Sequence, residues 1–147
     1  MRQAEKLLQQ LIKEVRASFQ DLKVLADLIH GPREITASMR SVLEYLDENG
    51  DEAVPKIAKA KNVSRQHIQQ IVDQLLEGGL VELKDNPVHQ KSRLVSQSPK
   101  GQEQFDAIRE YERDIVRRLS ATLDEDDLSI SVNTLKQLRQ LIKEISL

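Results

Sequence analysis

The chain has 147 residues, a formal net charge of −2, an apolar fraction of 39% and an aromatic fraction of 3%. It has no cysteine, which excludes disulfide bonds, thiolate zinc sites and thiol redox sensing. No apolar run approaches the ~18 residues of a membrane-spanning helix, and the first ten residues lack a secretory apolar region. We therefore expect a soluble cytoplasmic protein with one compact domain or one domain with long helical arms, its core completed by a second chain.

The first 30 residues are expected to form one long helix. Apolar residues recur with near-heptad spacing through residues 2–30, for example at Leu8, Val15 and Leu22, and Gly31-Pro32 ends the pattern. About four heptads without Gly or Pro carry more apolar surface than a small core needs, so we expect a partner helix. The alternative is that this helix covers its own domain.

Three shorter elements are expected next. A second helix is predicted over Ile35–Leu46, with Asn49-Gly50 ending it, and residues 51–53 form a short strand. Pro55 suits the first turn of a third helix, which runs to about Ala60.

Lys61-Asn62 is predicted to be the turn before a fourth helix, because Asn tolerates a left-handed backbone. Ser64 is the expected N-cap, and Val63 can pack on Ile68. Gly78-Gly79 stops the helix.

A β-hairpin and two long helices are predicted for the rest of the chain. The stretches 80–84 and 93–97 alternate apolar and polar residues, and the loop between them holds Asn86-Pro87. Ser98-Pro99 restarts a helix that reaches about Ala121. The acidic run 124–127 is expected to cap the last helix at its positive end; a metal site is the less favoured alternative.

Positive charge is concentrated in one part of the chain. Residues 54–101 hold eight basic and four acidic residues, a net charge of +4, so the remainder carries −6. Phosphate binding requires this kind of local excess.

The candidate base-reading residues lie on the polar face of the fourth helix. Side chains of this kind can contact base edges in a major groove, Gln pairing with adenine and Arg with guanine or phosphate. The alternative is a solvated polar face, but hardly a carboxylate precedes Asp73 on it. The candidates are Ser64, Arg65, Gln66, His67, Gln69 and Gln70.

The hairpin loop supplies further candidates: Lys84, His89, Lys91 and Arg93. Their side chains could straddle a DNA backbone or enter the minor groove. An exposed basic loop can also be merely soluble, and His89 can be a simple turn residue.

These residues resemble the winged helix-turn-helix of the MarR family of bacterial transcriptional regulators. The resemblance is carried by Val63-Ser64-Arg65-Gln66, by Gly79-Leu80-Val81 before the hairpin, and by Ser98-Pro99-Lys100-Gly101 after it. It implies a mainly α fold with a small β-hairpin wing and long N- and C-terminal dimerisation helices. Residues 1–31 and 102–147 would then dimerise, and residues 35–101 would form the DNA-binding lobe.

The resemblance also implies function. Family members are homodimers that bind pseudo-palindromic operators, usually as repressors, and many release DNA when a small ligand binds. The family's usual wing has an Asp-x-Arg pair, whereas this chain has Val88-His89-Gln90-Lys91-Ser92-Arg93, so the wing's internal salt bridge is not expected. An effector would bind near a set of residues that are otherwise ordinary junction and core positions: His30, Arg33, Met39, Tyr45 and Tyr111.

We expect no enzymatic activity, metal or cofactor. The three histidines fall in separate predicted elements, and no nucleophile motif accompanies them. The sequence therefore predicts a homodimeric regulator of transcription that binds double-stranded DNA. The alternative is a winged-helix adaptor that binds another protein.

Overall fold

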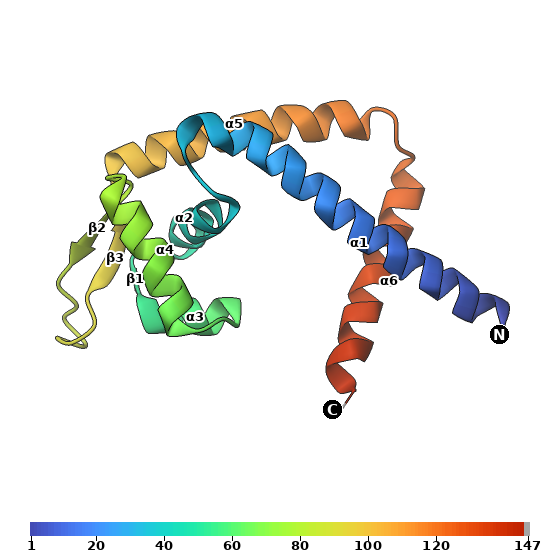
Figure 1. The fold of residues 1–147 in the computed structure, drawn as a ribbon, viewed down its shortest axis with the longest axis horizontal. Helices are drawn as coiled ribbons and strands as arrows, with labels where there is room; N and C mark the ends of the chain where they lie inside the picture. The colour runs from blue at the N-terminus through green and yellow to red at the C-terminus, as the bar shows by residue number, and fades with distance from the viewer. Residues whose placement is uncertain (146–147) are drawn as a thin grey trace. The chain divides into compact units, whose positions relative to one another are not determined.

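A computed structural model describes residues 1–145 of the chain and confirms the mainly α fold with a hairpin wing (Figure 1). It has two compact units, residues 1–109 and the part that begins at Glu110. The elements in chain order are α1 (Gln3–His30), η1 (Gly31–Arg33), α2 (Ala37–Asn49), β1 (Glu52–Ala53), α3 (Val54–Lys61), α4 (Arg65–Glu77), β2 (Val81–Lys84), β3 (Leu94–Gln97), α5 (Pro99–Ser120) and α6 (Glu125–Glu144).

The predicted elements are confirmed with small shifts of their ends. The second helix begins at Ala37 and not at Ile35, because the Thr36 hydroxyl accepts a hydrogen bond from the Met39 amide at 3.1 Å and caps the helix. Asp124 caps α6 in the same way, its carboxylate accepting from the Asp127 amide at 2.9 Å. This confirms the capping role predicted for the acidic run.

The three strands form one antiparallel sheet in the order β1-β3-β2. Val95 at the centre of β3 lies opposite Glu52 of β1 and Leu83 of β2. β1, the strand outside the hairpin, directly precedes α3. The sheet therefore connects the hairpin to the start of the helix-turn-helix.

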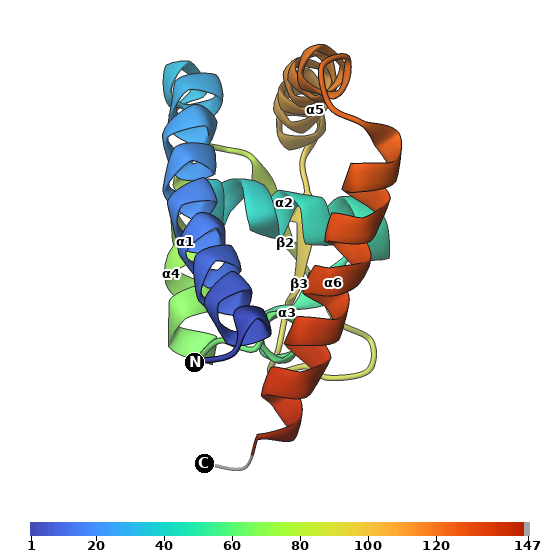
Figure 2. The same ribbon diagram turned by 90° about the vertical axis from the view of Figure 1, so that its right-hand side faces the viewer.

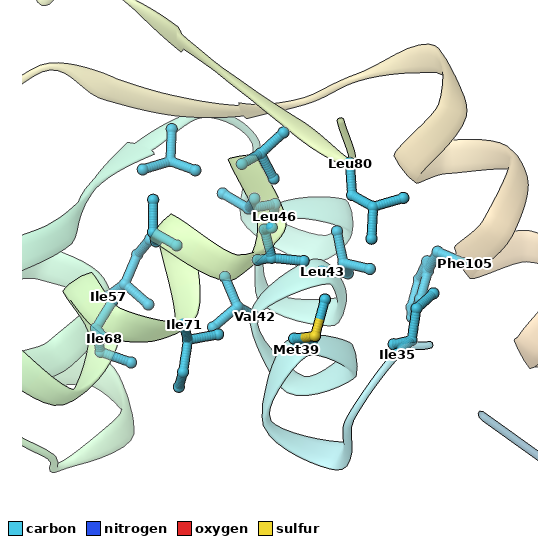
Figure 3. Close-up of a cluster of buried hydrophobic side chains, with 14 of the residues drawn as sticks. Ile35, Met39, Val42, Leu43, Leu46, Ile57, Ile68, Ile71, Leu80 and Phe105 are labelled. Atoms are coloured by element: carbon cyan, nitrogen blue, oxygen red, sulfur yellow. The ribbon is translucent and has the colours of Figure 1, made fainter. Parts of the chain in front are cut away.

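The hydrophobic core of the first unit lies between α2, α3, α4 and the sheet. Figure 3 shows Val42 of α2 close to Ile71 of α4, and Leu43 on the side of α2 that faces Leu80 and Phe105. Phe105 of α5 lies next to Ile35, and both are buried. Nine-tenths or more of each of these side chains is removed from water, which is the main stabilising contribution to the helix-turn-helix.

The base of the hairpin is joined to the start of α5 by a compact set of hydrogen bonds. The Ser98 hydroxyl donates to the Gly79 carbonyl at 2.6 Å and accepts from the Gly101 amide at 3.0 Å. The Lys100 ammonium donates to the Gly78 carbonyl at 2.9 Å. These bonds fix the hairpin relative to the C-terminal end of α4.

The long helices expose apolar side chains. Of the 28 residues of α1, only His30 is buried, and Leu22 is 62% exposed. No residue of α6 is buried. None of the helices in residues 1–145 combines the length and apolar character needed to cross a bilayer.

Candidate nucleic-acid interface

The turn between α3 and α4 has the predicted geometry. Asn62 is left-handed, with φ of 55°, and the Ser64 hydroxyl accepts a hydrogen bond from the His67 amide at 3.0 Å. Ser64 therefore acts as the N-cap of α4, as predicted. Its hydroxyl oxygen is engaged with the helix, while its hydroxyl hydrogen can still be donated to a ligand.

One face of α4 is apolar and buried, and the other is polar and exposed. Ile68, Ile71, Val72 and Leu75 belong to the core. The Gln69 amide nitrogen donates to the Asp73 carboxylate at 2.9 Å, which orients the Gln69 side chain along the helix. The predicted base-reading residues Arg65, Gln66, His67, Gln69 and Gln70 are all exposed.

The wing is a loop between β2 and β3 whose start is shaped by Asn86. The Asn86 side-chain carbonyl accepts from the Val88 amide at 3.1 Å, as in an Asx turn. His89, Lys91 and Arg93 are exposed, and Val88 near the tip is 81% exposed. In both ribbon views, the loop and the N-terminal end of α4 lie at the same end of the first unit (Figures 1 and 2).

Two hollows lie between the wing and the helix-turn-helix. A cleft of about 430 Å³ is lined by Arg65, Gln66 and Gln69 of α4 and by Lys91 and Arg93 of the wing. The structure thus brings together five of the ten predicted DNA-binding residues. A neighbouring hollow of about 520 Å³ is lined by residues that include His89, Pro87 and Val88 of the wing and Lys56 of α3.

The basic residues of the module differ in their availability. Lys84 lies 3.6 Å from the Asp51 carboxylate, and Lys100 is bonded to a backbone carbonyl. Within the part of the chain that the structure describes, Arg65, Lys91 and Arg93 have no carboxylate within ion-pair distance. These three cations are therefore free to bind an external anion.

The residues proposed from the resemblance for an effector are only partly brought together. Arg33 and Met39 line a hollow of about 620 Å³, with Gln74, Glu77 and Lys100 among its other lining residues. His30 is buried, and neither it nor Tyr45 lines this hollow. Tyr111 belongs to the second unit and is 57% exposed.

Sequence reasoning missed two residues that shape this surface. Lys56 was counted in the charge excess but was not assigned to the site, and it lines the hollow beside the wing. Asp51 partly neutralises Lys84 across the sheet. Neither is detectable from spacing, because each contact joins residues 30 or more positions apart. Within residues 1–145, no three His, Asp or Glu side chains gather where they could hold a metal ion.

Comparison with known proteins shows what this architecture resembles. No protein-family model matches the chain. Uncharacterized proteins of Mycobacterium tuberculosis and Mycobacterium bovis are 27% identical over 136 residues, which is 88% of this chain and 95% of theirs.

Several solved structures superpose on nearly the whole chain. A MarR family transcription regulator superposes with a TM-score of 0.86 at 22% identity over 97% of both chains. MarR from Staphylococcus aureus, solved with salicylate and kanamycin, gives 0.85 at 15% identity over 96% of both chains. A MarR variant from E. coli, solved with operator DNA, gives 0.79 at 19% identity over 94% of this chain and 99% of that one. The chain therefore has the winged-helix fold of MarR regulators, which confirms the resemblance at the level of fold.

Proposed function

We propose that this protein is a homodimeric transcriptional regulator that binds double-stranded DNA in a sequence-specific manner. The observation that carries the proposal is the surface formed by α4 and the wing. An exposed glutamine-rich helix face lies beside three cations that have no internal partner in the described residues. Major-groove recognition requires such a polar helix face, and affinity for DNA requires unpaired positive charge next to it.

In this proposal each protomer places α4 in a major groove. Gln66, Gln69 and Gln70 contact base edges, and Arg65 contacts guanine or phosphate. Ser64 and His67 lie at the end of the helix that enters deepest. The wing residues Lys84, His89, Lys91 and Arg93 lie beside the same duplex. Lys84 contributes least, because Asp51 already offsets its charge.

The apolar surface of the long helices supports a dimer. α1 and α6 expose large hydrophobic side chains, including Phe19 at 64% and Leu141 at 61%. A second copy of the chain would remove this surface from water and would pair two recognition helices, as a pseudo-palindromic operator requires. Repression then follows sterically where the operator overlaps a promoter.

The MarR of Staphylococcus aureus was solved with salicylate and kanamycin, which supports a role for a small effector here as well. The hollow beside Arg33 and Met39 is the place in the first unit where we propose that such a molecule binds and lowers DNA affinity.

The first test is selection of bound sequences from a random duplex pool with the purified full-length protein. We expect enrichment of an inverted repeat with half-sites about one helical turn, roughly 34 Å, apart. A folded dimer that enriches nothing at low salt would instead support the alternative, an adaptor that binds another protein through α4.

A double variant tests the assignment of the recognition helix. Arg65→Ala with Gln70→Ala changes two exposed residues and leaves the core intact. It should abolish specific duplex binding and leave the oligomeric state unchanged. A variant that binds the selected operator normally would contradict the role of α4.

A further inference from the structure

The cleft between α4 and the wing has the properties of an oxyanion site. Its cationic lining residues are Arg65 from the first turn of α4 and Lys91 and Arg93 from the returning arm of the wing. No Asp or Glu lines it. Three cations in one open cleft create a positive potential that favours binding of an anion, since no acidic side chain among the lining residues neutralises them.

The same end of α4 adds a fixed positive potential. α4 begins at Arg65, and the first amides of a helix have no intrahelical acceptor. The Ser64 hydroxyl accepts from the His67 amide, and it does not bond the amides of Arg65 and Gln66. The helix dipole therefore has the same sign as the three side chains that line the cleft.

The wing tip has a different character from this cleft. Pro87 and Val88 lie at the outer part of the loop with His89, and they line the neighbouring hollow against α3, which shares Arg65 and Ser92 with the cleft. Val88 is 81% exposed, so the tip presents an apolar side chain to solvent beside the exposed His89. Lys91 and Arg93 lie on the returning arm and line the cleft beside Arg65.

We propose that this cleft binds the sugar–phosphate backbone of the duplex, so that Lys91 and Arg93 contact phosphate and do not read minor-groove bases. The inference rests on the proposed DNA-binding function and adds a division of roles. Gln66 and Gln69, which also line the cleft, face the adjoining major groove, the cleft holds the phosphates beside it, and the tip residues Val88 and His89 approach the minor groove. The backbone contact then sets the register in which α4 meets the bases.

The main test compares Arg93→Ala and Lys91→Ala with Lys84→Ala as a matched control. All three remove one positive charge from the same hairpin, but Lys84 does not line the cleft and is paired with Asp51. Binding is measured against salt concentration for the selected operator and for versions altered at the base pairs that flank each half-site. Each lost phosphate contact should make the slope of log K against log[salt] shallower by about 0.9.

For the cleft variants we expect weaker binding by the same factor on every duplex and a shallower salt slope, whereas Lys84→Ala should show neither to the same extent. Loss of affinity confined to particular flanking base pairs, with an unchanged slope, would overturn the proposal and assign Arg93 to minor-groove reading. An effect of Lys84→Ala equal to that of Arg93→Ala would also overturn it, because the cleft would then have no special role.

A second measurement tests anion binding by the cleft independently of DNA binding. Inorganic phosphate is titrated into the full-length protein without DNA while NMR signals of the arginine side chains and the α4 amides are followed. Saturable shifts at Arg65 and Arg93, with the Arg65 shift lost in Arg93→Ala, would support an oxyanion site even if no duplex were bound. Shifts spread over all surface lysines and arginines would overturn the oxyanion site. Failure to bind any duplex would overturn the proposed function and the backbone contact, and would leave a cleft that binds phosphate alone.

Discussion

Gly101 shows how one residue can hold the hairpin and α5 together. A side-chain carbon at this position would lie 2.0 Å from the Leu80 carbonyl oxygen, a backbone atom that cannot move independently. The Gly101 amide also donates to Ser98, whose hydroxyl reaches Gly79. The close approach of the Gly101 and Leu80 backbones is therefore possible only because glycine has no side chain.

Gly101→Ala is predicted to be strongly destabilising. The added methyl group must displace the Leu80 backbone, and overpacking of this kind lowers the free energy of unfolding by about 1–3 kcal/mol or more. The control is Gly31→Ala, where nothing lies within 4 Å of the added carbon and the backbone is right-handed. Urea unfolding of both variants checks this, and equal stabilities would contradict the close contact.

Loss of the Tyr45 hydroxyl proton is expected to destabilise the folded state. Burial, and secondarily the carboxylate of Glu52, raise the pKa of the Tyr45 hydroxyl above its ordinary value of about 10. The folded state then holds the proton more tightly than the unfolded state. The resulting stability is fully present below pH 10 and is lost as pH rises through the folded pKa.

This coupling can be measured in a Tyr111→Phe background, where Tyr45 is the sole remaining tyrosine of the sequence. Its ultraviolet titration should have a midpoint above that of free tyrosine. Above pH 10, stability should fall more steeply in this protein than in one that also carries Tyr45→Phe. Identical pH profiles would show that the hydroxyl is not perturbed.

At the scale of elements, local sequence predicted most of the fold but not the assembly of the site. Asn62 and Ser64 act within the local backbone, and Ser98 accepts from the Gly101 amide three residues on, so these roles are readable from spacing. The Ser98 bond to Gly79, 19 residues away, is not. The cleft brings Arg65 of α4 together with Arg93, which directly precedes β3, so it depends on how the hairpin is placed against the helix-turn-helix. Periodicity carries no signal for such contacts, which is why the wing residues were predicted as a set without distinct roles.

The exposed stripe of α1 predicts a subunit interface. Leu22 is 62% exposed in the single chain, so a substitution there should change stability by less than about 0.5 kcal/mol if the protein were a monomer. In a dimer that uses this stripe, Leu22→Asp places a carboxylate in an apolar interface and should shift the protein towards monomer. Gln20→Asp introduces the same side chain on the opposite face of the helix and should leave the dimer intact.

Sedimentation velocity over a range of concentrations distinguishes the three proteins. If Leu22→Asp sediments as the unmodified chain does, the stripe is not the interface. If Gln20→Asp also dissociates, general destabilisation of α1 is the better explanation, and circular dichroism would reveal it.

At the scale of the whole molecule, a dimer with two fixed recognition helices measures the distance between half-sites. Half-sites one helical turn apart present the same face of the duplex to both protomers. Inserting five base pairs between them rotates one half-site by about half a turn, so only one protomer can then use its α4 and its cleft. Affinity should fall towards that of an isolated half-site, because the second set of contacts is lost.

Inserting ten base pairs returns both half-sites to the same face of the duplex but increases the distance between them. If the dimer is rigid, this insertion should therefore recover little of the affinity. Electrophoretic mobility shift with the three spacings tests this at one fixed salt concentration, since phosphate contacts make affinity depend steeply on salt. Undiminished binding at the five-base-pair insertion would mean that the two lobes act independently. The long helices would then join the protomers without fixing the distance between their recognition helices, and specificity would reside in single half-sites.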